Sequence, residues 1–244
     1  MDAPVAGIDG CKGGWLAVAC QPFAFAAAEA EIFETFQAAM DALRHAPVVI
    51  VDMPIGLTDD PRAGRGVDQD MRRLLNARVP VGDPKAGSRV FSPPPRGAVD
   101  GFRAGQDYWA INAALPEGKR LSKQAFNITA KIAEVDDWID MEAQRRVREG
   151  HPELAFAELT GATLPPKKSA DGADARDGAL TALAFDLSAL RADLGPRTER
   201  WLEDDLKDAA VLAWVASRCK TGDALRLPPT VATDARGLRV EVWF

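Results

Sequence analysis

The chain has 244 residues, of which 47% are hydrophobic and 27% charged, a composition typical of a globular protein and unlike that of a disordered segment. Its 36 acidic residues outnumber 30 basic ones, and the resulting formal charge of −6 argues against a broad, non-specific nucleic-acid surface. At this length one domain, residues 1–244, can bury a sizeable core without disulfides.

The cysteines indicate a reducing environment. Cys11, Cys20 and Cys219 are odd in number and match no zinc-binding spacing, so we expect no metal bound by thiolates. We find no signal-peptide pattern, and acidic residues interrupt every apolar run before it could span a bilayer. We therefore expect a cytoplasmic protein without a membrane partner; its oligomeric state stays open.

The first third of the chain predicts strands and one helix. "PVVIVDM", residues 47–53, is a continuous apolar run, as in a strand covered on both faces. Asp52 lies at its end, and Asp9 ends the first strand in the same way. In chain order we expect strands at residues 5–9, 15–20 and 23–33, a helix at 36–44 and a fourth strand at 47–53.

Residues 57–121 differ from the rest. They hold eight Gly and seven Pro, with 11 basic against 8 acidic residues, so their charge is about +3 and that of the remainder about −9. We expect a basic insertion that is mostly loop, with one short helix near residues 68–78. Long irregular insertions are usually functional or mobile.

The second half returns to regular patterns. We expect a helix at residues 122–139 with Ser122 as its N-cap, a strand near 146–150, a solvated loop at 165–178, a buried helix at 204–219 and a final strand in "LRVEVWF". Strands and helices in this order predict an α/β fold with a mixed sheet.

Four carboxylates are the main candidates for chemistry. Asp9 and Asp52 lie at strand ends, while Asp205 and Asp208 share a face of the buried helix. If the elements are neighbours, these acids converge and repel each other unless a divalent cation holds them. Oxygen ligands favour Mg²⁺ or Mn²⁺, and two such ions can promote phosphodiester cleavage.

Each acid also has a structural interpretation. Asp204 and Asp205 lie in the first turn of a helix, where acids commonly interact with the helix dipole. Asp52 could organise a turn, and "DG" followed by "GG" after Asp9 is a hairpin signal. Asp208 lies inside the helix beside apolar residues, where an unpaired carboxylate is costly.

Other side chains are candidates for substrate contact. Lys12 among glycines could face a phosphate, although no P-loop pattern is present. His151 could carry protons with Glu153, or serve structure only. Lys123 is either a surface residue or a phosphate contact, and "FSPPPR" could line the site with Arg96.

Six ordered blocks resemble a known family. "GIDGCKGGWLAV", "VDMPIGL", "VFSPPPR", "SKQAFNITAKIAEVD", "HPELAFAELTG" and "DDLKDAAVLAW" are similar to blocks of domain of unknown function 429, an uncharacterised bacterial and archaeal family. Its members are described as predicted nucleases with a ribonuclease H-like fold. The resemblance implies a mixed five-stranded sheet flanked by helices, with a long insertion after the fourth strand.

The resemblance also implies a site. In the similar Holliday-junction resolvases, acids on strands one and four and a "DxxDA" pair bind two metals, which here correspond to Asp9, Asp52, Asp205 and Asp208. Two departures stand out: Asp52 is a methylene shorter than the resolvase glutamate, and Gly150 replaces a branched residue, which predicts a looser strand before Glu153.

Three functional hypotheses follow. The first is a Mg²⁺- or Mn²⁺-dependent nuclease acting on DNA or RNA, branched or single-stranded, guided by the basic insertion. The second is a phosphotransferase or small phosphoester hydrolase of the actin and sugar-kinase type, although such enzymes normally carry two copies of the fold. The third is a non-catalytic binding module, favoured if the acids pair with arginines.

Overall fold

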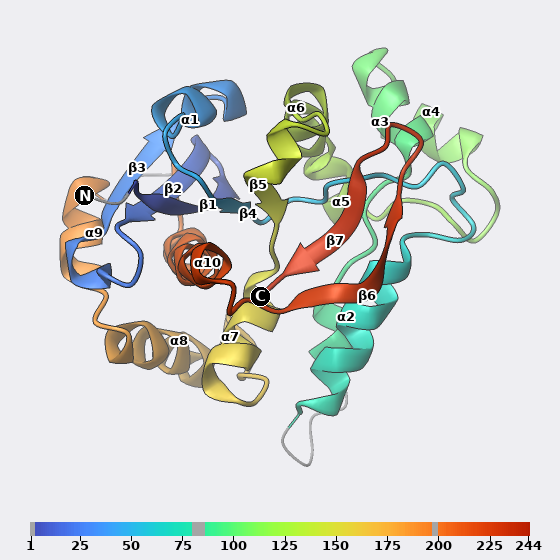
Figure 1. Cartoon of the computed structure of the whole chain (residues 1–244). Helices are drawn as coiled ribbons and strands as arrows, with labels where there is room; N and C mark the ends of the chain where they lie inside the picture. The colour runs from blue at the N-terminus through green and yellow to red at the C-terminus, as the bar shows by residue number, and fades with distance from the viewer. Residues whose placement is uncertain (1–2, 80–85, 197–199) are drawn as a thin grey trace.

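A five-stranded mixed sheet forms the centre of the protein (Figure 1). The computed structural model describes residues 3–79, 86–196 and 200–244. The strands are β1 (Val5–Cys11), β2 (Gly14–Cys20), β3 (Glu29–Phe33), β4 (Val49–Val51) and β5 (Val147–Glu149), in the order β3-β2-β1-β4-β5. β1 is antiparallel to β2 and parallel to β4, and β5 is parallel to β4.

Helices cover both faces of this sheet (Figure 1). One face packs against α7 (Pro152–Thr160), α8 (Ala170–Ala182), α9 (Leu187–Asp193) and α10 (Glu203–Thr221), and the other against α1 (Phe36–Ala42) and α6 (Thr129–Trp138). Alternate residues of β1 supply the two cores, with Val5 on the α10 side and Ala6 and Ile8 on the α1 side. The α/β sheet with helical layers is therefore as predicted.

The strands predicted early in the chain are confirmed with altered ends. β1 continues past Asp9, because Gly10 pairs with Trp15 and Cys11 with Gly14 in a tight hairpin. The predicted strand at residues 23–33 begins with a 3-10 turn, η1 (Phe25–Ala27), and only its second half is β3.

The prediction of mostly loop for residues 57–121 is wrong in its described part. Helix α2 (Gly66–Ala77) lies where the one helix was expected, but η2 (Ala86–Arg89), α3 (Arg96–Arg103) and α4 (Tyr108–Ala114) are additional. Pro95 is the N-cap residue of α3, which accommodates Gly97 and Gly101 in its interior. Asp107 caps α4 by accepting the N–H groups of Trp109 and Ala110.

Two further segments differ from prediction. Residues 122–139 form two helices, α5 (Lys123–Asn127) and α6, which meet at Ile128, and Ser122 caps α5 through the N–H of Ala125. The predicted loop at 165–178 is helical from Ala170, because Ser169 accepts the N–H of Gly172 and starts α8.

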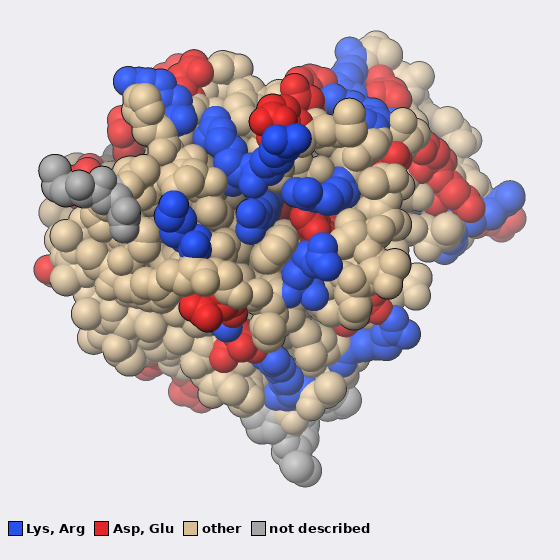
Figure 2. All heavy atoms as spheres, viewed as in Figure 1, with Lys and Arg blue, Asp and Glu red and all other residues tan. Residues whose placement is uncertain are grey.

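The last two strands, β6 (Arg226–Thr233) and β7 (Arg239–Trp243), form a separate antiparallel ribbon. A β-bridge between Trp243 and Gly150 joins this ribbon to the end of β5, which follows the short helix η3 (Ala143–Arg145) in the chain. Lys and Arg side chains gather over the middle of the face in Figure 2, where β5 and β7 lie. Arg148 and Arg226 lie over the Trp243 ring, 4.4 and 5.8 Å from its centroid. No helix in the described ranges is long and apolar enough to cross a membrane.

Candidate functional site

Close packing of β1 on α10 directs Asp9 toward the start of that helix. A Cβ atom on Gly7 would lie 2.1 Å from the carbonyl oxygen of Ala209 and 2.3 Å from the backbone nitrogen of Ala213, so only glycine allows this approach. Asp9 is two residues further along the strand and therefore on the same face. It is buried, with 8% of its surface exposed.

Asp52 and Asp208 complete a group with Asp9. Ile8 pairs with Val51, and the N–H of Asp52 donates to the carbonyl of Ile8 at 2.9 Å, so Asp52 follows β4 directly beside Asp9. Asp208 comes from the second turn of α10. One carboxylate oxygen from each of the three residues lies within 4.8 Å of the others. Two oxygens that bind one Mg²⁺ at about 2.1 Å lie at most about 4.2 Å apart, so this spacing is close to what a shared cation requires.

The surroundings of these three carboxyl groups strongly disfavour their ionised form. Burial, followed by the charges of Asp52 and Asp208, raises the pKa of Asp9 well above its ordinary value. Burial and Asp208 raise the pKa of Asp52 to about 8. The pKa of Asp208 is also raised, chiefly by burial.

A fourth residue, Lys167, lies beside this group and was not predicted from the sequence. Its Nζ lies 2.9 Å from Oδ2 of Asp208, and the three acids raise the pKa of the ammonium group. Lys167 comes from the segment between α7 and α8, where charged residues show no periodicity. In its position the ammonium group partly compensates the charge of the cluster.

Asp205 lies beside the cluster but has a second role. Its Oδ2 accepts the N–H of Leu202 at 2.8 Å, which caps the start of α10. Burial raises its pKa to about 6, with a further contribution from Asp208. Asp205 lines the same hollow as the three acids, although it is not in the group whose oxygens lie within 4.8 Å.

Glu153 and His151 also line this hollow, but their environments differ from those of the acids. Glu153 pairs with Arg89 at 2.7 Å and with Arg176, and although burial opposes them these arginines lower its pKa. Burial lowers the pKa of His151 to about 4. At neutral pH Glu153 is therefore ionised and His151 neutral, which does not suit a proton relay between the two.

The three predicted cationic contacts are separated in space. Lys12 lies in the β1–β2 turn and lines a hollow that contains Asp9 and Asp52. Arg96, by contrast, pairs with Asp136 at 3.1 Å and Asp234 at 2.6 Å, so its role is to join α6 to the β6–β7 turn. Lys123 lies over the Tyr108 ring, 4.7 Å from its centroid.

Gly150 does not loosen β5, contrary to expectation. A Cβ atom there would lie 2.3 Å from Cγ2 of Ile50 and 2.7 Å from Cδ2 of Leu212, so the glycine is required by close packing. Glu149, immediately before it, is buried, accepts the N–H of Ile55 at 2.8 Å and pairs with Arg65 at 2.6 Å. This pair fixes the chain that leaves β4.

The acids face two neighbouring hollows. One, of about 430 Å³, is lined by all four candidate aspartates together with Lys167. The other, of about 310 Å³, shares Asp9, Asp52 and His151 with it and adds Lys12. A ligand in either hollow would therefore reach the carboxylates.

The donor set fits a hard divalent cation. Three carboxylates from three different elements present oxygen atoms to one point, and burial penalises their charges. Among the described residues, the cation paired with this group is Lys167, and a single ammonium leaves two negative charges uncompensated when all three acids ionise.

Fold and site together define a mixed α/β protein with a buried carboxylate cluster at the end of its central strands. The chain belongs to the family described as "Protein of unknown function (DUF429)", whose model matches residues 7–233. Searches of curated proteins and of solved structures found no match.

The raised pKa values predict how stability depends on pH. Between about pH 6.5 and 8 the folded protein holds a proton on Asp52 that the unfolded chain has released, so the free energy of unfolding falls as pH rises. His151, with its lowered pKa, has the opposite effect only below about pH 6.5.

We expect urea unfolding in EDTA to show this fall, and Asp52→Asn to reduce it by about 1 kcal/mol across the window. A wild-type protein that becomes more stable from pH 6.5 to 8, or a variant with the same slope, would contradict the assignment.

Proposed function

We propose that this protein is a divalent-metal-dependent phosphodiesterase that acts on nucleic acid, with Mg²⁺ or Mn²⁺ held by Asp9, Asp52 and Asp208. The observation that supports it most is the convergence within 4.8 Å of three carboxylates, of which Asp9 and Asp208 are buried and Asp52 is half-buried. Within the described residues, none of the three forms an ion pair with an arginine, whereas Glu149, Glu153 and Asp136 do. This contrast favours a ligand-binding role for the cluster over a purely structural one.

The strand arrangement also supports the proposal. The order β3-β2-β1-β4-β5, with β2 antiparallel to its neighbours, is compatible with a ribonuclease H-like fold. The family resemblance implies that fold, with metal-binding acids on the first and fourth strands and the last helix. Fold alone does not define function, so the proposal rests on the geometry of the carboxylates.

The residues have separable roles in such a reaction. A bound divalent cation would activate a water molecule and stabilise the charge that develops on the phosphate. Asp9, Asp52 and Asp208 would hold it on the floor of the hollow. Asp205 would orient Asp208 by fixing the first turn of α10, and neutral His151 could accept a hydrogen bond from the attacking water.

A cleavage assay tests this function. Purified protein with Mn²⁺ is incubated with labelled single-stranded, duplex and branched DNA and RNA, and with a small phosphomonoester as the alternative substrate. We expect metal-dependent cleavage of at least one nucleic acid. Cleavage of the monoester alone would favour the small-phosphoester hydrolase, and no metal-dependent hydrolysis of any substrate would contradict the proposal.

Lys167 should compete with a cation for Asp208. We expect Lys167→Gln to lower the melting temperature in EDTA by a few degrees, because it leaves Asp208 without its partner, and to increase the stabilisation that Mn²⁺ produces. Lys168→Gln is the matched control, because Lys168 lines the same hollow and is exposed. Equal responses of the two variants to Mn²⁺ would show that Lys167 does not compete.

A further inference from the structure

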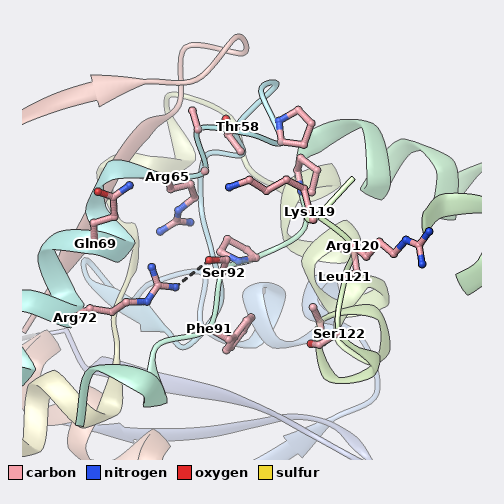
Figure 3. A pocket seen from close by; sticks show the side chains of 17 residues that line it. Thr58, Arg65, Gln69, Arg72, Phe91, Ser92, Lys119, Arg120, Leu121 and Ser122 are labelled. Atoms are coloured by element: carbon pink, nitrogen blue, oxygen red, sulfur yellow. Dashed lines mark hydrogen bonds between the residues drawn. The ribbon is translucent and has the colours of Figure 1, made fainter. Parts of the chain in front are cut away.

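A third hollow continues from the carboxylate site and carries the opposite charge. It measures about 460 Å³ and is lined by residues of α2, the 91–95 segment and the turn before α5 (Figure 3). Its charged lining residues are Arg65, Arg72, Lys119 and Arg120, and no acidic residue lines it among the described residues. In a chain with a net charge of −6, this concentration of positive charge needs an explanation.

The cations in this hollow differ in how far they are already committed. Arg65 is buried and paired with Glu149 and Asp68, so its charge is largely balanced. Arg72 donates to the carbonyl of Val90 at 3.0 Å and to Oγ of Ser92 at 2.9 Å, both neutral partners. Figure 3 shows Lys119 pointing toward Arg65 and Gln69, while Arg120 points away from them. The charge of Arg72 also acts on Asp68, which already pairs with Arg65, so Arg72 is only partly balanced and, with Lys119, supplies the remaining positive charge.

Phe91 connects the basic hollow to the acids. Its side chain is 36% exposed, and it lines all three hollows. Arg72 contacts the residues on either side of it, donating to the backbone carbonyl of Val90 and to the side-chain hydroxyl of Ser92. An exposed aromatic ring fixed beside a cationic hollow is the arrangement that single-stranded nucleic-acid sites use to stack a base next to a bound phosphate.

We propose that this hollow is a second phosphate-binding subsite for a single-stranded oligonucleotide. One backbone phosphate binds between Arg72 and Lys119, the neighbouring unpaired base stacks on Phe91, and the strand continues to the carboxylate cluster. The inference rests on the proposed nuclease function and narrows its substrate to an unpaired strand, because a paired base cannot present its face to Phe91.

Binding without metal tests the subsite separately from cleavage. Fluorescence anisotropy in EDTA measures the affinity of wild type and variants for a labelled oligothymidylate, over a series of salt concentrations. We expect Lys119→Ala to weaken binding severalfold and to reduce the slope of log K against log salt by about 0.7, the value for one phosphate contact on a single strand. Arg120→Ala, which removes the same charge from the adjacent residue, should have a clearly smaller effect on both.

The stacking contact has its own test. We expect Phe91→Leu to weaken binding about tenfold, and Phe91→Trp to retain it. The loss should disappear when the oligonucleotide is abasic, because no base remains to stack. A duplex of the same sequence should bind less tightly than the single strand.

The outcomes distinguish this inference from the nuclease proposal. Binding that depends on Lys119 and Phe91, without metal-dependent cleavage, would support the subsite and contradict the nuclease. Four results would each overturn the subsite, whatever the cleavage assay shows. The first two are equal effects of Lys119→Ala and Arg120→Ala, and a loss of affinity in Phe91→Leu that persists with abasic strands. The other two are tighter binding of duplex than of single strand, and no binding by the wild type at low salt.

Discussion

Replacing Asp9 by asparagine is expected to lower metal-dependent cleavage about 100-fold or more while raising the stability of the metal-free protein. The loss follows because the change removes one of three charged ligands from the proposed cation site. The gain follows because Asp9 is a buried carboxylate whose charge is opposed by desolvation, Asp52 and Asp208. Opposite effects on activity and stability are typical of functional residues and not of structural ones.

Asp204→Asn is the matched control for this experiment. Asp204 lies on α10 one residue before Asp205, carries the same charge and is outside the three-carboxylate group. We expect its cleavage rate to stay within a few fold of wild type. Asp9→Asn with unchanged cleavage would indicate a contaminating nuclease, and a lower melting temperature of that variant in EDTA would mean that Asp9 serves the fold.

Gly7→Ala should destabilise the protein by about 3 kcal/mol or more. The added Cβ would overlap the backbone of α10 at Ala209 and Ala213, and backbone atoms cannot move aside as a flexible side chain can. The overlap would force β1 and α10 apart, and this would also separate Asp9 from Asp208. Chemical denaturation measures the first effect, and the response of the melting temperature to Mn²⁺ measures the second.

Gly178→Ala provides the comparison. Gly178 lies inside α8, and a Cβ atom there meets nothing within 4 Å. Because alanine is the better helix former, we expect this variant to be more stable by about 0.5–1 kcal/mol. If both substitutions have the same sign and size, close packing at Gly7 is not what requires its glycine.

Much of the central fold and of the carboxylate group could be predicted from sequence. The apolar run before Asp52 and the hairpin glycines after Asp9 define two strands, and the apolar surface of the last helix requires it to be buried beside them. Once the strands are neighbours, their acids must lie close together. Because the last helix packs on these strands, Asp208 also lies close to the two acids, although the sequence around it shows no partner for its charge.

The remaining elements could not be read from local patterns. The density of Gly and Pro in residues 57–121 suggested loop, yet Pro95 and Asp107 stand at helix starts, where they favour helices. β6 was missed because its residues are mostly exposed and include Pro228 and Pro229. Lys167 was missed because its importance depends on a contact with Asp208, 41 residues away.

Two predicted site residues take part in ion pairs. Arg96 was expected to line the site and Glu153 to carry protons with His151, and sequence spacing cannot reveal that each has an ion-pair partner. Their partners, Asp234 and Arg89, come from distant parts of the chain. Phe91, from the same motif as Arg96, is the residue that the structure places against all three hollows.

The central claim is that Asp9, Asp52 and Asp208 bind a divalent cation, and calorimetric titration of Mn²⁺ at pH 7 tests it most directly. We predict saturable binding to wild type and to Asp204→Asn, with loss of binding in Asp9→Asn. Because the pKa of Asp52 is about 8, binding should release protons, and the measured heat should vary with the ionisation enthalpy of the buffer. No saturable binding at millimolar Mn²⁺, or equal binding by Asp9→Asn, would contradict the account.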